Sequence, residues 1–186
     1  MTENKIVSFD DEMLIVVDEH DNVVDYKSKL DCHRGNGILH RAFSLFVFNS
    51  RRELMLQQRS GQKMLWPLFW SNTCCSHPRK GEELDEAVQR RLKEETGINT
   101  ELKYLFKFQY QANYLNAGSE NEICAVYIGK SDTEPMVNKN EIADWKFISI
   151  PDLSAEINNH PRKYTPWFNM EWQRLTTDFI DEINAL

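Results

Sequence analysis

The segment from Asp85 to Thr96 has the pattern of an amphipathic helix, but its apolar face also contains charges. At about 100° per residue, that face carries the side chains of Leu84, Ala87, Val88 and Leu92. Arg91 and Glu95 project from the same face, and Gly97 stands where the helix should end. If Arg91 and Glu95 stood alone, the simplest explanation would be an i,i+4 ion pair at the edge of the apolar stripe. The packing of this helix must therefore accommodate two charges on its inward side.

Segments rich in aromatic and β-branched residues flank this helix and are typical of strands. We expect hairpins from 13–17 with 22–27 and from 42–49 with 53–60, a short strand at 66–70, and strands at 103–114, 120–129 and 142–149. The stretch 31–40 reads as a loop. A terminal helix is expected from Tyr164 onward, with Pro166 near its first turn. Mixed strands with few helices predict an α+β fold, a sandwich rather than a doubly wound sheet.

Composition and charge limit the partners of this 186-residue chain. The formal net charge of -7 leaves no basic surplus for many phosphates, so we expect no nucleic-acid partner, although a local basic cluster can hold a small anion. The N-terminus has no signal-peptide pattern and no stretch is long enough to cross a bilayer, which predicts a cytoplasmic protein without a membrane partner. We find no repeat or linker, and we expect a single domain over 1–186 and a monomer.

The four cysteines are expected to be free thiols, because a vicinal pair is poor material for a disulfide framework. They are Cys32, Cys74, Cys75 and Cys124. In an extended segment, Cys74 and Cys75 point to opposite sides, so only one of them can enter a pocket. The others should pack as small apolar residues. Trp66 and Trp70 are expected in the core or in a pocket wall.

The charges of the helix belong to a longer pattern. Glu82 is followed, after seven residues, by the run Arg90-Arg91-Leu92-Lys93-Glu94-Glu95-Thr96-Gly97-Ile98. This pattern resembles the Nudix box, which implies a mixed β-sheet sandwich flanked by helices, with a core at about 38–172, an N-terminal hairpin and a C-terminal helix. Two positions differ, because Ser76 replaces the first glycine of the box and Arg91 replaces a glutamate. A guanidinium there favours phosphate binding over metal-assisted cleavage of a diphosphate.

A second set of residues resembles one family within that superfamily, the type 1 isopentenyl diphosphate isomerases. Cys75 precedes His77-Pro78 immediately before the box, and the other matching residues are Lys29, His33, His40, Arg59, Lys63, Tyr110, Glu120-Asn121-Glu122 and Pro166-Trp167. The likeness covers the chain from about Lys29 to Trp167. It implies an isomerase of isoprenoid biosynthesis that interconverts isopentenyl diphosphate and dimethylallyl diphosphate by metal-dependent protonation and deprotonation.

The predicted metal ligands are His33, His40, His77, Glu120 and Glu122. Glu120 and Glu122 lie two residues apart on a strand and so point to one side of a sheet. Three imidazoles with two carboxylates suit Mn²⁺ or Zn²⁺ better than Mg²⁺, although Mg²⁺ stays open. The remaining histidines, His20 and His160, are expected in solvent.

The implied reaction needs two acid/base groups on opposite faces of a dry, apolar pocket, because an unactivated alkene is a poor base. By resemblance, Cys75 is one of these groups and Glu122, with Tyr110 beside it, is the other. Which of them protonates isopentenyl diphosphate stays open. Trp167 would face the cationic carbon, where a desolvated indole contributes roughly 2 kcal/mol or more.

The resemblance assigns the binding of the substrate diphosphate to Lys29, Arg59, Lys63 and Arg91. Glu95 would hold one Mg²⁺ ion that bridges to the same diphosphate, because this ion prefers carboxylate and phosphate oxygens. The site would therefore use two cations, one in the histidine cluster and one with the substrate.

Two other functions stay in view. A Nudix hydrolase of a diphosphate substrate would release phosphate or a monophosphate, but the arginine at position 91 speaks against it. A non-catalytic zinc-binding module would use Cys74, Cys75, His77 and His33, would lose its fold with a chelator and would not turn over any substrate. The zinc module leaves the charges on the inward side of the helix unexplained.

Overall fold

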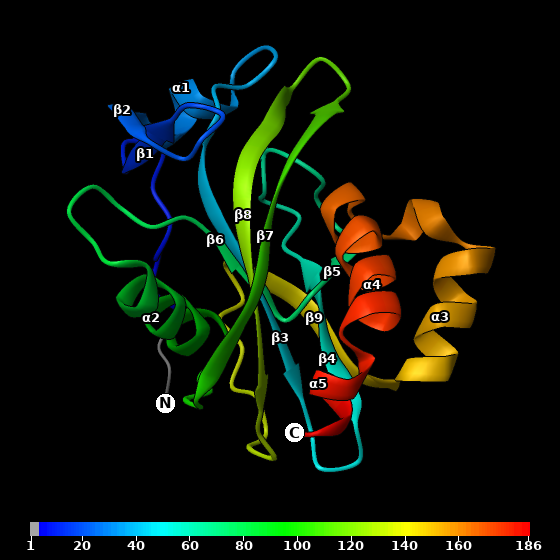
Figure 1. Cartoon of the computed structure of the whole chain (residues 1–186). Helices are drawn as coiled ribbons and strands as arrows, with labels where there is room; N and C mark the ends of the chain where they lie inside the picture. Colours follow the sequence, from blue (N-terminus) through cyan, green and yellow to red (C-terminus); the bar gives the residue numbers. More distant parts are fainter. Residues whose placement is uncertain (1–3) are drawn as a thin grey trace.

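The computed structural model describes residues 4–186, which form one mixed sheet with helices on both sides (Figure 1). The strands are β1 (Met13–Val17), β2 (Val23–Ser28), β3 (His40–Phe48), β4 (Glu53–Arg59), β5 (Trp70–Ser71), β6 (Cys74–Ser76), β7 (Leu102–Tyr114), β8 (Gly118–Lys130) and β9 (Ile142–Ser149). The helices are α1 (Lys29–His33), α2 (Leu84–Thr96), α3 (Ile150–Asn159), α4 (Pro166–Asp178) and α5 (Ile180–Asn184), with a 3-10 helix, η1 (Pro161–Lys163).

Strand β3 holds the sheet together, because it pairs with several other strands. It runs parallel to β8, from His40 opposite Glu122 to Phe48 opposite Lys130, and antiparallel to the short strand β6. β7 continues the sheet beyond β8, and β9 lies along β4. A strand that is covered on both faces needs apolar side chains on both, which explains the nearly continuous apolar run of β3.

Alternate side chains of β3 enter two separate hydrophobic cores. On one face, Phe46 stacks on Phe168 of α4 with ring centroids 5.9 Å apart. On the other face, Leu45 belongs to the core that contains Val88 and Leu92 of α2. Figure 1 shows α2 on one side of the sheet and α3 and α4 on the other. The predicted α+β sandwich flanked by helices is confirmed.

Helix α2 begins one residue before its predicted start and ends at the predicted residue. Gly97 follows it with a φ of 72°, and its N–H donates to the carbonyl of Lys93. This left-handed conformation closes a helix and suits glycine, which has no Cβ. Arg91 and Glu95 are 2% and 1% exposed. The prediction that both charges lie on the inward face is confirmed.

The short strand predicted at 66–70 is wrong, since only Trp70 joins a strand there. Trp66 and Leu68 have φ values of 46° and 64°, which interrupt an extended backbone. The turned carbonyls of Leu65 and Trp66 accept hydrogen bonds from the Arg59 guanidinium at 2.9 Å and 3.1 Å. The apolar run therefore forms a loop that holds Arg59 instead of pairing as a strand.

Two short helices fall where the sequence predicts none. α1 lies partly within the expected loop 31–40, and its cap is the Ser28 hydroxyl, which accepts from the Asp31 N–H at 3.1 Å. α3 follows β9 directly, and its cap is Ser149, which accepts from the Asp152 N–H at 3.3 Å. α1 has only five residues, too few to show a clear helical period in the sequence. α3 is longer, and its start signals, the cap residue Ser149 and Pro151 in the first turn, were missed.

The terminal helix and the second hairpin also differ from their predictions. The terminal helix is interrupted at Phe179, whose φ of -129° ends α4 before α5 begins. The ring of this residue stacks on Phe106 of β7 at 5.0 Å, so packing on the sheet coincides with the break. In the hairpin, β3 and β4 pair only at Phe48 and Leu54; further along β4, Gln57 and Gln58 pair with β5, and β9 pairs with β4 over its whole length.

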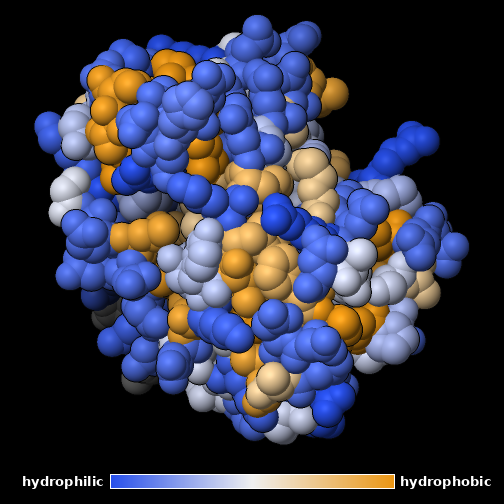
Figure 2. Space-filling model, in the orientation of Figure 1, coloured by the Kyte–Doolittle hydropathy of each residue, from blue (hydrophilic) through white to orange (hydrophobic). Residues whose placement is uncertain are grey.

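The surface is mostly polar on the face shown in Figure 2, with apolar side chains gathered along its middle, over β7 and beside α4.

His20 and His160 are exposed, as predicted. Within residues 4–186, no helix is both long and apolar enough to span a membrane.

Candidate metal and proton-transfer site

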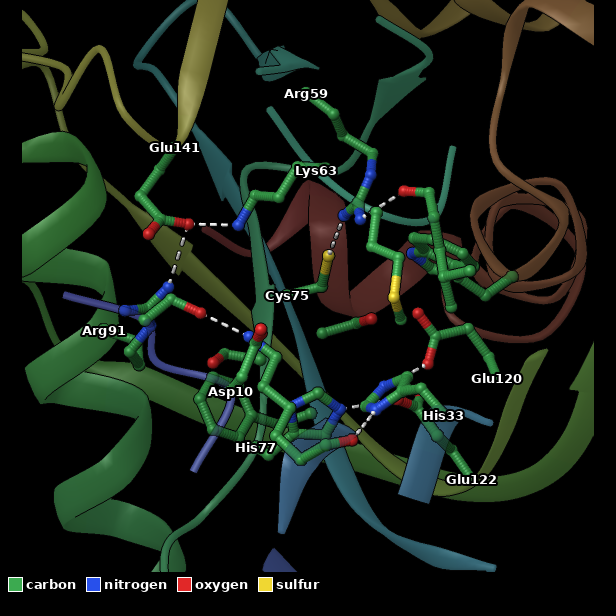
Figure 3. A pocket seen from close by; sticks show the side chains of 18 of the residues that line it. Asp10, His33, Arg59, Lys63, Cys75, His77, Arg91, Glu120, Glu122 and Glu141 are labelled. Carbon is green, nitrogen blue, oxygen red and sulfur yellow. Dashed lines mark hydrogen bonds and ion pairs between the residues drawn. The ribbon is translucent and has the colours of Figure 1, made fainter. Parts of the chain in front are cut away.

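Five buried side chains gather beside the start of β3 and offer ligand atoms that all lie within 4.8 Å of one another. They are the predicted ligands His33, His40, His77, Glu120 and Glu122. Figure 3 shows His33, His77 and the two glutamates converging on one side of a cavity. The structure therefore brings the complete predicted ligand set together.

The sheet register explains this convergence. His40 begins β3 and is the parallel neighbour of Glu122 on β8, with Glu120 two residues earlier on the same side. His33 is the last residue of α1, whose side lies against β8. His77 follows β6, which pairs with β3. Four separate parts of the chain thus supply the cluster.

Two of the imidazoles are oriented by backbone carbonyls. His33 Nδ1 lies 2.6 Å from a carbonyl oxygen of α1, and His40 Nδ1 lies 2.7 Å from the carbonyl oxygen of the residue two positions before it. Because a carbonyl only accepts, each Nδ1 carries a hydrogen, and in the neutral ring Nε2 is a free lone pair. These lone pairs face carboxylate oxygens, at 2.8 Å from Glu120 and 3.5 Å from Glu122 respectively.

The cluster fits a divalent cation. Within residues 4–186, the buried atoms His40 Nε2 and Glu120 Oε2 have no hydrogen bond. Lone pairs that face one another in a buried space are costly unless a positive charge lies between them. Imidazoles fixed through Nδ1 by a carbonyl are the usual way in which a protein presents Nε2 to a metal. Hydrogen bonding among the described residues therefore leaves His40 Nε2 and Glu120 Oε2 without a hydrogen bond, and a bound cation would satisfy both atoms.

Electrostatics favour the ligand forms of two of these groups. Burial, followed by electrostatic interaction with His40 and His33, lowers the pKa of His77 well below its ordinary value. Burial alone would raise the pKa of Glu122, but the neighbouring His40 and the hydrogen bond from Tyr110 outweigh it and lower this pKa. For His33, burial lowers the pKa, and the Glu120 carboxylate outweighs it, so that the pKa is raised. A neutral His77 and an ionised Glu122 are the forms that coordinate metals.

A cavity of about 460 Å³ opens beside the cluster, and all four predicted catalytic side chains line it. Cys75 comes from β6, Glu122 from β8 and Tyr110 from β7, and Trp167 comes from the first turn of α4. The Tyr110 hydroxyl donates to Glu122 Oε2 at 2.5 Å, since these residues are opposite neighbours in the β7–β8 pair. Burial, with the Glu122 charge after it, raises the pKa of Tyr110 well above its ordinary value.

The two neighbouring cysteines point to opposite sides of β6, as predicted. Cys74 is fully buried in the core under α2, whereas Cys75 lines the cavity. Cys75 Sγ lies 3.7 Å from Arg59 Nη1. Burial raises the pKa of the Cys75 thiol to about 12, and the positive charge of Arg59 only partly opposes this rise. Cys75 therefore holds its proton in the free protein.

Trp167 lines the cavity next to Arg59 and packs against Trp66. Trp167 is 2% exposed and stands at 90° to the ring of Trp66, with centroids 5.2 Å apart. The Arg59 guanidinium carbon lies 5.3 Å from the centroid of Trp167. The expectation that Trp66 packs in the core or a pocket wall is confirmed, since it is 4% exposed in the core under α4.

The four predicted substrate-binding cations, Lys29, Arg59, Lys63 and Arg91, all line this cavity. Lys29 Nζ contacts the hydroxyl of Ser8, and burial, with the charge of Lys63 after it, lowers the pKa of Lys29 to about 8. Arg91 Nη1 donates to the backbone oxygen of Val7 at 2.7 Å. The N-terminal segment therefore lies against the basic side of the cavity.

Glu95, the predicted ligand of a Mg²⁺ ion, lies behind Arg91. Its Oε1 accepts from Arg91 Nη2, and Gln57 Nε2 lies 3.5 Å from its Oε2. Among the described residues that line the cavity, Glu95 does not appear. Mg²⁺ binding by Glu95 therefore stays a prediction. Over residues 4–186 the metal cluster contains no cysteine, which contradicts the zinc module that would use Cys74 and Cys75.

The sequence patterns do not identify three further cavity residues, Ser8, Asp10 and Glu141. Glu141 is 3% exposed and contacts Lys63 and Arg91. Its position directly before the strand predicted at 142–149 was the available signal, but many acidic residues in this chain precede strands or turns. Only the folded arrangement distinguishes it.

Comparison with known structures defines the class of protein. Residues 38–168 match the NUDIX domain family. The crystal structure of DR0079 from Deinococcus radiodurans has a TM-score of 0.73 and 24% identity, and the similarity covers 88% of this chain and 98% of that one. The MutT protein from Methanosarcina mazei Go1 has a TM-score of 0.63 and 17% identity, over 80% of this chain and 96% of that one. The chain has the Nudix fold and belongs to the NUDIX domain family.

Comparison with individual sequences narrows this assignment. Isopentenyl-diphosphate Delta-isomerase 1 from Photorhabdus laumondii is 44% identical over an alignment of 174 positions, which covers 92% of this chain and 99% of that protein. Isopentenyl-diphosphate Delta-isomerase 2 from Aromatoleum aromaticum is 42% identical, over 84% of this chain and 82% of that protein. Within the NUDIX domain proteins, this chain is a member of the isopentenyl-diphosphate Delta-isomerase family.

Proposed function

We propose that this protein is an isopentenyl-diphosphate Delta-isomerase that interconverts isopentenyl diphosphate and dimethylallyl diphosphate. The observation that carries the proposal is that one cavity is lined by both an acid/base pair and a group of cations. Cys75 and Glu122, from separate strands, line it beside the metal cluster, and Lys29, Arg59, Lys63 and Arg91 line it as well, with Arg59 next to Cys75. A substrate with a short hydrocarbon chain and a diphosphate needs both kinds of group.

The protonation states of the free protein support an acid/base pair. The isomerisation adds a proton at one carbon and removes one from another, so the protein must start with one donor and one acceptor. The raised pKa of Cys75 keeps its thiol protonated, and the lowered pKa of Glu122 keeps its carboxylate ionised. Tyr110, which donates to Glu122, would hold the acceptor in place. The pair therefore contains the single proton that the reaction needs.

The rings around the cavity would protect the positive charge that develops on the substrate. Trp167 is buried against Trp66, and an indole face attracts a cation that water cannot reach. A dry pocket also prevents water from trapping the carbocation. We propose that Trp167 stabilises the cationic carbon, by roughly 2 kcal/mol or more.

Lys29, Arg59, Lys63 and Arg91 would bind the diphosphate. Arg59 and Arg91 are both strongly buried and fixed by carbonyl oxygens, so their guanidinium groups are oriented before the substrate arrives. We propose that Glu95 contributes to a Mg²⁺ ion on the diphosphate, next to Arg91.

The three histidines and two glutamates of the cluster would hold one divalent cation. Mixed nitrogen and oxygen ligands favour Mn²⁺ or Zn²⁺ over Mg²⁺. When bound, such a cation supplies a positive charge that resets the proton affinity of neighbouring groups. Because Glu122 belongs to both the cluster and the acid/base pair, the cluster would orient this carboxylate toward the substrate.

The test is to incubate the protein with isopentenyl diphosphate, Mg²⁺ and Mn²⁺ in deuterated water and to follow the label by NMR. We expect deuterium to enter dimethylallyl diphosphate with the wild-type protein. The Cys75→Ala variant should lose this activity, because it removes a proton-carrying group from the cavity. The Cys74→Ala variant is the matched control and should retain it, because Cys74 faces the opposite core.

Two outcomes would contradict the proposal. Release of inorganic phosphate or a monophosphate, without any labelled isomer, would show that the protein is a hydrolase. Equal labelling by wild type and Cys75→Ala would show that the Cys75 thiol does not take part in the reaction.

A further inference from the structure

Glu141 links two cations that come from distant parts of the chain. Its Oε2 contacts Lys63 Nζ and lies 3.3 Å from Arg91 Nη2 (Figure 3). Lys63 belongs to the loop after β4, and Arg91 to the middle of α2. The Glu141 side chain is only 4% exposed, so water competes weakly for these contacts. Both cations line the cavity proposed for the diphosphate.

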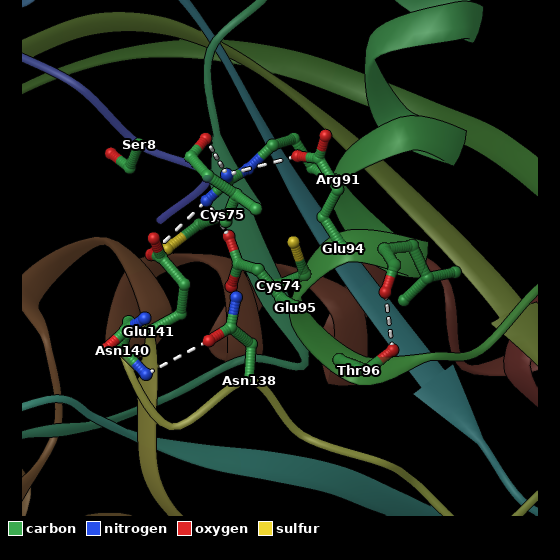
Figure 4. A network of polar contacts seen from close by, with 12 residues as sticks. Ser8, Cys74, Cys75, Arg91, Glu94, Glu95, Thr96, Asn138, Asn140 and Glu141 are labelled. Carbon is green, nitrogen blue, oxygen red and sulfur yellow. Dashed lines mark hydrogen bonds and ion pairs between the residues drawn. The ribbon is translucent and has the colours of Figure 1, made fainter. Parts of the chain in front are cut away.

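The backbone holds Glu141 in this place from both sides. The N–H of Ser60, near the start of the Lys63 loop, donates to the Glu141 carbonyl at 2.9 Å. The Asn138 N–H donates to the carbonyl of Glu95 at the end of α2, at 2.8 Å, and the Glu141 N–H donates to the Asn138 carbonyl at 3.0 Å. Figure 4 shows Asn138, Glu141, Glu95 and Arg91 gathered in this network. The turn before β9 is thus fastened to both elements that carry the cations.

The two cations differ in how much they depend on Glu141. Arg91 also contacts Glu94 and Glu95 and donates to the Val7 carbonyl. Lys63, whose side chain is 21% exposed, has no second ion pair within residues 4–186. A long, flexible ammonium side chain at the edge of a cavity turns to water when nothing holds it. Glu141 is therefore the group that keeps Lys63 directed inward, beside Arg91.

We propose that Glu141 is a positioning residue for diphosphate binding, which holds the Lys63 ammonium and the Arg91 guanidinium together at one end of the cavity. The inference rests on the proposed isomerase function. Two like charges that share a buried region repel each other, and a carboxylate between them allows both to stay before a substrate arrives. The charges of Lys63 and Arg91 overcome the effect of burial and lower the pKa of Glu141 to about 2, so the carboxylate is ionised at neutral pH.

The test uses Glu141→Gln, which keeps the shape of the side chain and removes its charge. We expect the KM for isopentenyl diphosphate and the Kd for inorganic pyrophosphate, measured by calorimetry at constant Mg²⁺, both to rise about tenfold, with kcat within about twofold of wild type. Glu53→Gln is the matched control, because Glu53 also pairs with an arginine but lies at the far end of β4. It should change neither constant.

A double-mutant cycle separates positioning from a general loss of stability. In a Lys63→Met background, Glu141→Gln should raise the pyrophosphate Kd by less than about threefold, because the main cation that it positions is already absent. An effect that is just as large in this background overturns the inference. If Glu141→Gln unfolds by circular dichroism, Glu141→Asp keeps the charge and should give a pyrophosphate Kd within about threefold of wild type.

Other outcomes also overturn the inference. Unchanged or tighter pyrophosphate binding by Glu141→Gln would show that the Glu141 carboxylate does not help binding and only competes with the anion for Lys63 and Arg91. A fall in kcat with KM unchanged would place Glu141 in the chemical step. A defect that appears only with Mg²⁺ would make it a metal ligand. A wild-type protein that binds pyrophosphate but does not isomerise would contradict the proposed function and leave the binding test of Glu141 intact.

Discussion

Glu171 lies on α4, one helical turn after Trp167, and its carboxyl group is buried against the sheet. Its Oε1 lies 3.5 Å from Cys124 Sγ, and within residues 4–186 its Oε2 has no hydrogen bond. Burial raises the pKa of Glu171 from 4.5 to about 8, and hydrogen bonds from Ser44 and Cys124 only partly oppose this rise. The free energy of unfolding should therefore depend strongly on pH through this one buried carboxyl group.

The sign of that dependence follows from linkage. Between pH 4.5 and about 8 the folded protein keeps the Glu171 proton that the unfolded chain loses. Stability is therefore fully present below pH 4.5 and is lost as the pH rises toward 8. We expect Glu171→Gln to raise the free energy of unfolding at pH 8.5 by a few kcal/mol, at about 1.4 kcal/mol per pKa unit, and to change it little at pH 5.

Urea unfolding of both proteins at the two pH values measures this effect. Glu156→Gln provides a control of opposite sign, because a hydrogen bond from Tyr164 lowers the pKa of Glu156. This control should gain no stability at pH 8.5. If Glu171→Gln is equally or less stable than wild type at pH 8.5, the Glu171 carboxyl is not a buried neutral acid.

At the scale of elements, the hairpin between β7 and β8 supports helix α1. Gly118 starts β8 with a φ of 149°, and a Cβ at this position would overlap the backbone oxygen of His33. The approach is possible because glycine has no side chain. His33 ends α1 and offers its Nε2 to the metal cluster, so the fit of hairpin against helix sets the position of one ligand.

We expect Gly118→Ala to displace His33 and to weaken Mn²⁺ binding by roughly tenfold or more, as disruption around metal ligands usually does. Isothermal titration with Mn²⁺ measures the affinity. Gly61→Ala is the control, since its new Cβ would meet Leu68 at an ordinary 3.6 Å. If Gly118→Ala binds Mn²⁺ with wild-type affinity, α1 can move to accommodate the new Cβ without weakening the metal site.

At the scale of the whole molecule, the metal cluster joins distant parts of the chain. Its ligands come from α1, β3, the segment after β6, and β8. A cation that binds all of them binds only the folded protein, so its binding energy adds to the free energy of unfolding. At a concentration of about 100 times Kd the gain is about 2.7 kcal/mol.

We therefore expect Mn²⁺ or Zn²⁺ to raise the Tm of metal-stripped protein by roughly 5–10 °C, and excess chelator to reverse the shift. Differential scanning calorimetry gives the measurement. His77→Ala should reduce the shift strongly, whereas His20→Ala should keep it, because His20 is exposed and outside the cluster. An equal shift in both variants would place the cation elsewhere.

Much of the site could be predicted because its residues lie in spaced motifs that resemble those of a known family. Cys75, His77 and Glu122 are examples, and the structure brings them to one cavity. Helix α1 could not be predicted, because five residues are too few to show a helical period. The loop at 66–70 was also unpredictable, because its apolar residues turn toward Arg59 rather than pairing as a strand.

Local patterns in the sequence by themselves determined most strands, helix α2 and its end at Gly97, because periodicity and helix termination depend on neighbouring residues. They also determined that Arg91 and Glu95 lie inward. Only the tertiary structure decided which groups meet those charges. Glu141 contacts Lys63 across 78 positions and Arg91 across 50, and such contacts depend on strand register and loop paths that local sequence does not encode.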